Sequence, residues 1–119
     1  MKKQTVYLLC GTMKDMRVVE TKGEVIDLTT NTGFIVKIAL LYKRPYYFAT
    51  HYETGLDCTP YYKPEDVTLC LGKRWRNKDE LIERLKLIDF ERMTQNEEYI
   101  SMFTSKIEEY KRNKEMINQ

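Results

Sequence analysis

The sequence predicts an α+β fold: an antiparallel β-meander of four to six strands in the N-terminal half, followed by two C-terminal helices packed on one face. Short runs rich in β-branched and aromatic residues, cut by glycine and proline, fill residues 1–72. Residues 77–115 instead carry apolar residues at helical spacing. A chain of 119 residues has the commonest length of one domain, so we expect a single domain over residues 1–119.

The first strands are indicated by alternation of apolar residues. One run covers 6–10, a second and weaker run covers 16–20, and a third covers 24–28. Lys22-Gly23 lies between the second and third runs, where we expect a turn. Such short connections favour neighbouring antiparallel strands.

The strongest run is FIVKIALLY (34–42), which is apolar on both faces apart from Lys37 and indicates a central strand. After a turn at 43–45, residues 46–52 form its expected partner. A further run at 67–71 is a candidate last strand, in competition with a helical turn opened by Pro64.

The second half predicts two helices. Asn77 is a candidate N-cap, and a capping-box pattern of Thr94 and Glu97 predicts that a second helix begins at 95. Each expected helix has an apolar stripe facing the core. The stripes consist of Leu81, Ile82, Leu85 and Ile88 in the first helix, and Tyr99, Ile100, Phe103, Ile107 and Tyr110 in the second.

Charge and cysteine content predict a cytoplasmic protein without cofactor or metal. The formal net charge is +2, too small to indicate nucleic-acid binding by itself. Cys10, Cys58 and Cys70 form neither a disulfide framework nor a zinc pattern, so we interpret them as reduced thiols. The N-terminus lacks the apolar core of a signal peptide, and no stretch has the length of a membrane span.

The stretch THYETGLDCTPYY (50–62) brings the only histidine close to a cysteine in sequence. Cys58 with His51, oriented by Asp57 or Glu53, has the residue types of a thiol nucleophile and its base. No nucleophile signature surrounds Cys58, and Glu53-Thr54-Gly55 reads as a turn that needs a left-handed residue at Gly55. No glycine-rich phosphate loop is present, so we predict that the protein is not an enzyme.

Tyrosines crowd the middle of the chain and indicate protein recognition, because tyrosine offers a large rigid surface with a polar tip. Alternation along the strand places Tyr46 and Tyr52 on one face and Tyr47 on the other. Tyrosine also forms strands well on half-exposed faces, which is the competing structural explanation. The predicted protein-binding residues are Tyr46, Tyr47, Tyr52, Glu53, Tyr61 and Tyr62.

A basic segment, GKRWRNK (72–78), supports an alternative function in nucleic-acid binding. Its cations could neutralise phosphates and its tryptophan could stack on a base. The structural explanation is that the tryptophan packs under the following helix while the charges solvate a loop. The residues of this alternative are Lys73, Arg74, Trp75, Arg76 and Lys78.

In length, composition and element order the chain resembles small accessory proteins of Gram-positive phages and mobile elements. Its segment FATHYETGL (48–56) is similar to the aromatic strands with a TG turn found in such proteins. Many of them are anti-defence factors, among them anti-CRISPR proteins, which bind a host CRISPR effector nuclease stoichiometrically. The resemblance implies a phage or mobile-element factor that binds and inhibits a host protein, with a CRISPR effector nuclease as the first candidate. Monomer and dimer are both compatible with the sequence.

Overall fold

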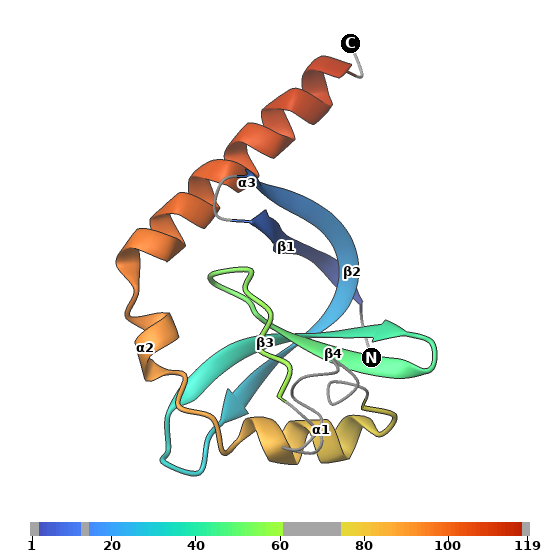
Figure 1. Ribbon diagram of the computed structural model, residues 1–119, viewed down its shortest axis with the longest axis vertical. Helices are drawn as coiled ribbons and strands as arrows, with labels where there is room; N and C mark the ends of the chain where they lie inside the picture. The colour runs from blue at the N-terminus through green and yellow to red at the C-terminus, as the bar shows by residue number, and fades with distance from the viewer. Residues whose placement is uncertain (1–2, 13–14, 61–74, 118–119) are drawn as a thin grey trace.

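The computed structural model describes residues 3–12, 15–60 and 75–117. Four strands form one antiparallel sheet in the order β1 (Gln4–Thr12), β2 (Asp15–Thr29), β3 (Ile35–Lys43) and β4 (Tyr46–His51). They are followed by α1 (Lys78–Leu85), a single turn α2 (Glu91–Thr94) and the long α3 (Glu97–Ile117). The predicted α+β meander with C-terminal helices is therefore confirmed (Figure 1). The candidate strand at 67–71 lies outside the described residues.

The expected turn at Lys22-Gly23 is wrong, because β2 runs through it as one strand of 15 residues. Its first half pairs with β1 and its second half with β3, and the strand curves between them (Figure 1). Gly23 allows a close approach there. A Cβ atom at Gly23 would lie 2.8 Å from a Leu41 methyl carbon and 2.9 Å from the Leu40 carbonyl oxygen. The glycine therefore marks tight packing within a strand, which in sequence looks like a strand break.

Both helices lie on the face of β2 that carries its even-numbered residues. Ile26 and Leu28 pack in the cluster that α1 completes, whereas Met16 and Glu20 contact α3. Because side chains alternate along a strand, these four residues share one face. The opposite face of the sheet, which we call the second face, carries the odd-numbered residues of β2. It also has buried side chains, namely Val6, Ala39, Leu41 and Thr50.

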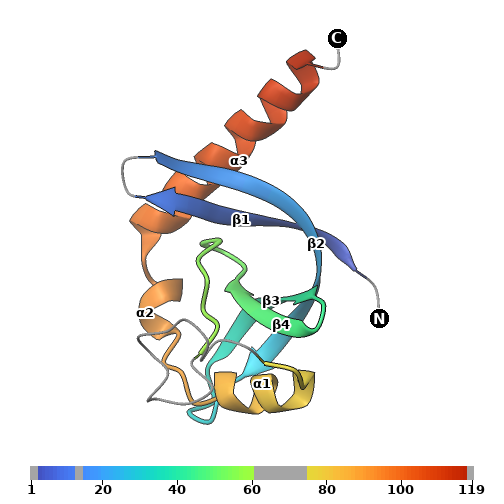
Figure 2. The same cartoon turned by 45° about the vertical axis from the view of Figure 1, so that its right-hand side comes forward.

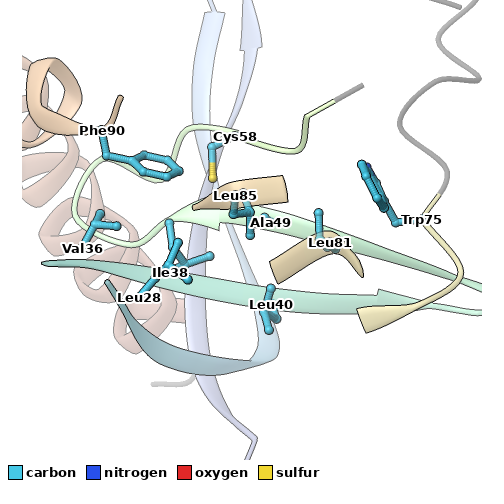
Figure 3. Close-up of a cluster of buried hydrophobic side chains, with 10 residues drawn as sticks. All are labelled: Leu28, Val36, Ile38, Leu40, Ala49, Cys58, Trp75, Leu81, Leu85 and Phe90. Carbon is cyan, nitrogen blue, oxygen red and sulfur yellow. The ribbon is translucent and has the colours of Figure 1, made fainter. Parts of the chain in front are cut away.

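The main core lies between α1 and the β2–β4 part of the sheet (Figure 3). Leu81 and Leu85 of α1 are fully buried there, as the predicted apolar stripe requires. Burying a leucine side chain stabilises the fold by roughly 1.5–3 kcal/mol. The buried members of this cluster are Leu28, Val36, Ile38, Leu40, Ala49, Cys58, Trp75, Leu81, Leu85 and Phe90.

The helix caps confirm one sequence prediction and correct another. The Asn77 side chain accepts a hydrogen bond of 3.1 Å from the Glu80 N–H, so Asn77 caps α1 as expected. The cap of α3 is Asn96, whose Oδ1 accepts from the Tyr99 N–H at 3.3 Å, and not the predicted Thr94. Thr94 ends α2, and its hydroxyl instead bonds His51.

The helix α3 is anchored along the β1–β2 hairpin, and its C-terminal end projects beyond the sheet in both views (Figures 1 and 2). Tyr110 meets Tyr7 of β1 edge-on, with ring centroids 6.1 Å apart. Lys114 forms an ion pair with Glu20 at 3.1 Å, and Lys106 Nζ donates to the Met16 carbonyl oxygen at 3.2 Å. The aromatic stripe predicted from helical spacing thus holds the helix against the hairpin.

A turn at residues 52–56 connects β4 back to β1. The Gly55 N–H donates to the His51 carbonyl oxygen at 2.8 Å, and the Leu9 N–H of β1 donates to the Gly55 carbonyl oxygen at 2.9 Å. Gly55 has φ +69°, the left-handed geometry that the sequence predicts for it. A Cβ atom there would lie 2.4 Å from the ring of Phe103, so the turn is wedged between β1 and α3.

Candidate functional site

The β3–β4 hairpin gathers aromatic and cationic side chains at the tip of the sheet. Tyr42 and Tyr47 are directly paired across the two strands, and their rings stack with centroids 4.6 Å apart. Tyr42 is 48% exposed, so this stack reaches the solvent. We call this region the hairpin surface and define it as Tyr42, Lys43, Arg44, Tyr46, Tyr47 and Arg76.

Trp75 joins the segment before α1 to this hairpin. The Tyr47 N–H donates to the Trp75 carbonyl oxygen at 2.7 Å, and the Trp75 indole N–H donates to the Pro60 carbonyl oxygen at 2.8 Å. The indole ring is 4% exposed and packs in the main core. This burial matches the structural explanation of the GKRWRNK segment, in which the tryptophan packs under the helix.

The position of Trp75 brings the next residue, Arg76, over the tyrosine ring that begins β4. The Arg76 guanidinium carbon lies 5.7 Å from the centroid of the Tyr46 ring, within the range of a cation–π contact. Lys43 and Arg44 are exposed at the same hairpin. Residues that the sequence assigned to two separate functions therefore meet at the β3–β4 hairpin, with the Tyr42–Tyr47 stack on one face and the Arg76–Tyr46 pair on the other.

Lys78 points to a different partner. Its Nζ forms an ion pair with Glu24 of β2 at 3.4 Å. This contact ties α1 to the sheet. Lys73 and Arg74, the other cations of the predicted nucleic-acid set, lie outside the described residues, as do Tyr61 and Tyr62 of the protein-binding set.

Tyr52 and Glu53 lie at the other end of β4 from the hairpin surface, so the structure divides the predicted tyrosine set. The Lys37 ammonium lies 6.0 Å from the Tyr52 ring centroid. Tyr52 and Glu53 also border a hollow of about 210 Å³ against α3. Sequence alternation correctly separates Tyr46 from Tyr47, but it cannot show which tyrosines meet across strands.

His51 is fully buried, and both of its ring nitrogens bond to threonine hydroxyls. Nδ1 lies 2.8 Å from Thr54 Oγ1, and Nε2 lies 3.1 Å from Thr94 Oγ1. The ring also stacks on Phe90, with centroids 6.2 Å apart. Burial lowers the pKa of His51 below its ordinary value, and the nearby Glu53 carboxylate opposes this shift only in part. The histidine thus connects β4 to α2 as a neutral ring.

Cys58 is buried in the main core, and its N–H donates to the Ala49 carbonyl oxygen at 3.0 Å. The neighbouring Thr59 hydroxyl donates to the same carbonyl oxygen at 3.1 Å, and its Oγ1 accepts from the Ala49 N–H. Asp57, the candidate orienting group, accepts from the Thr59 hydroxyl at 2.7 Å. The contacts seen at Cys58 and Asp57 serve to hold residues 57–59 along β4.

Within the described part of the chain, no group of three or more histidine, cysteine or acidic side chains is placed to hold a metal ion. None of the described helices combines the length and the apolar character needed to cross a membrane. Comparisons with protein-family models, curated proteins and solved structures find no match to this chain.

Proposed function

We propose that this protein is a non-enzymatic binding protein that docks its hairpin surface on a host protein and inhibits it. The observations that carry the proposal are the Tyr42–Tyr47 stack, which reaches the solvent on one face of the hairpin, and the Arg76–Tyr46 pair on the other face. Tyrosine and arginine are the residue types most enriched at binding hot spots. Stacking in the unbound protein already restricts these side chains, which lowers the entropy cost of docking.

The charge of the hairpin surface suits a partner with an acidic patch. Lys43, Arg44 and Arg76 contribute three cations to the hairpin surface, which contains no acidic residue. Complementary charge raises the rate of association and fixes the orientation of the two partners. The resemblance to anti-CRISPR proteins makes a CRISPR effector nuclease the first partner to examine.

The test is a titration of a purified CRISPR effector nuclease from a Gram-positive bacterium, with cleavage of its target DNA as the readout. We expect cleavage to end at an equimolar ratio, together with a stable complex in size-exclusion chromatography, because a binder acts by occupancy. If a much smaller than equimolar amount of this protein inhibited the nuclease progressively with time, that would indicate an enzyme. Absence of both complex and inhibition across such nucleases would contradict the choice of partner.

The second candidate function is nucleic-acid binding. The presence of Lys43, Arg44 and Arg76 at the same hairpin as the exposed Tyr42 favours it, because cations contact phosphates while an aromatic face stacks on a base. Fluorescence anisotropy with a single-stranded oligonucleotide at low salt separates the two functions. This candidate is supported if the oligonucleotide binds and the double variant Arg74→Ala, Arg76→Ala binds it more weakly, with an affinity that depends less steeply on salt. If no oligonucleotide binds, this candidate is removed.

A further inference from the structure

The two outer edges of the sheet differ in how their backbone groups are satisfied. Along β4, the N–H groups of Tyr47, Ala49 and His51 all have partners, namely the Trp75 carbonyl oxygen, Thr59 Oγ1 and the Leu56 carbonyl oxygen. The chain thus covers this edge with its own residues. Edge strands left open are sites where another chain can pair.

The outer edge of β1 is covered at one point only among the described residues. The Leu9 N–H faces away from β2 and bonds Gly55, so the N–H groups of Thr5 and Tyr7 face the same way. No described residue supplies a backbone partner to either of them. The strand QTVYLLCGT contains no charged residue and no proline, the usual protections of an open edge.

Hollows flank this edge on both faces of the sheet. On the helix face, a hollow of about 210 Å³ lies between Tyr7, Tyr52, Glu53 and the apolar stripe of α3. On the second face, one of about 180 Å³ lies between Leu8, Phe48, Lys43 and Gly55. Both hollows border the 52–56 turn, and only the first also borders Tyr7. Successive side chains of an added strand point to opposite faces, so a residue on the helix face beside Tyr7 would enter the first hollow.

We propose that the β1 edge at Thr5–Tyr7 binds an extended segment of a partner protein as an additional antiparallel or parallel strand. The segment would carry an apolar residue toward Tyr7 and α3, and acidic residues beside Lys22 and Lys111 and away from Glu53. Lys22, which donates to Thr5 Oγ1 at 2.7 Å, and Lys111, 5.4 Å from the Tyr7 ring centroid, supply positive charge beside the edge. The edge residues Thr5–Tyr7 do not belong to the hairpin surface, although Lys43 of that surface lines the hollow on the second face.

A second copy of this chain fits the edge less well. If two β1 strands paired antiparallel with Tyr7 opposite Tyr7, Thr5 would stand opposite Leu9 of the other copy. The Leu9 N–H already bonds Gly55, so the 52–56 turn occupies that place. A short peptide meets no such obstacle at Thr5 and Tyr7.

The experiment selects phage-displayed random decapeptides on the folded protein and measures the affinity of the enriched peptides by fluorescence anisotropy. We expect enriched sequences with alternating apolar residues, free of proline and flanked by acidic residues. Thr5→Pro removes only an N–H that faces outward, whereas Thr5→Ala keeps it, and both lose the bond to Lys22. Thr5→Pro should weaken binding about tenfold or more relative to Thr5→Ala, because a backbone hydrogen bond is lost.

Equal affinity of the two variants would overturn the proposal, as would failure to enrich any peptide. If Thr5→Pro does not fold, the alternative is to methylate the backbone nitrogens of an enriched peptide one at a time. We then expect binding to be lost when every second nitrogen is methylated and kept at the others. A third outcome is that no peptide is enriched, that the protein self-associates in sedimentation velocity, and that Thr5→Pro abolishes this self-association. That outcome would assign the edge to a second copy instead. Tyr42→Ala should leave peptide affinity unchanged, which keeps this test distinct from that of the hairpin surface.

Discussion

His51 is held in its neutral form by its surroundings, and this has a consequence for stability. Its imidazole is fully buried between Thr54 and Thr94, where a charged ring would lose the solvation it has in the unfolded chain. The folded-state pKa therefore lies below 6.5, the ordinary value. Protonation then favours the unfolded state, which binds the proton first as the pH falls.

We expect the free energy of unfolding to be largest above pH 6.5 and to decline as the pH falls through 6.5 toward the lower folded-state pKa. Urea denaturation at a series of pH values measures this decline. In the variant His51→Gln, which cannot titrate at this position, the decline between about pH 7 and 5.5 should be smaller. Equal pH dependence in the two proteins would show that His51 is not the group responsible.

At the same scale, the sequence foretold the roles of some residues and not of others. Alternation and turn chemistry identified Gly55, Asn77 and the separation of Tyr46 from Tyr47, because these depend on neighbours in the chain. The sequence did not reveal the hydrogen bond between Thr94 and His51, because that contact joins residues 43 positions apart. A threonine three residues before a glutamate reads as a capping box whether or not its hydroxyl is used elsewhere.

At the scale of elements, the 52–56 turn connects three parts of the fold. It continues β4, bonds β1 through Leu9, and packs Gly55 against Phe103 of α3. The turn itself was predictable from Glu53-Thr54-Gly55. Its neighbours were not, because docking against β1 and α3 depends on the curvature of β2 around Gly23, which in sequence looked like a break.

We expect Gly55→Ala to be among the most destabilising glycine substitutions in the chain. Its Cβ atom would lie 2.4 Å from the Phe103 ring, and the residue has φ +69°. Left-handed backbone and overpacking together should cost about 3 kcal/mol or more. The matched control is Gly33→Ala, since Gly33 has φ +88° but nothing within 4 Å of the added atom. It should cost only about 1 kcal/mol.

Chemical denaturation of both glycine variants checks this comparison. A larger loss at Gly55 than at Gly33 isolates the contact with Phe103 from the backbone strain that both positions share. Equal losses would mean that the 52–56 turn can move away from α3 without cost, and that the turn does not fasten the helix to the sheet.

At the scale of the whole molecule, the fold presents two surfaces in different ways. One edge of the sheet is covered by residues 56–59 and Trp75, and this covering brings Arg76 to the hairpin surface. The other edge, β1, is closed at Leu9 alone among the described contacts. The chain order of strands and helices was readable from the sequence, but the meeting of Arg76 with Tyr46 required the bridge between Tyr47 and Trp75.

The central claim is that the hairpin surface binds a protein partner, and the affinity of Tyr42→Ala for that partner tests it most directly. The control is Ile35→Ala, since Ile35 is 65% exposed at the far end of the same strand. Isothermal titration with the purified nuclease should show the affinity of Tyr42→Ala weakened by on the order of 1–2 kcal/mol, as expected of a hot-spot tyrosine. Ile35→Ala should bind as the unchanged protein does. Unchanged affinity of Tyr42→Ala would contradict the account.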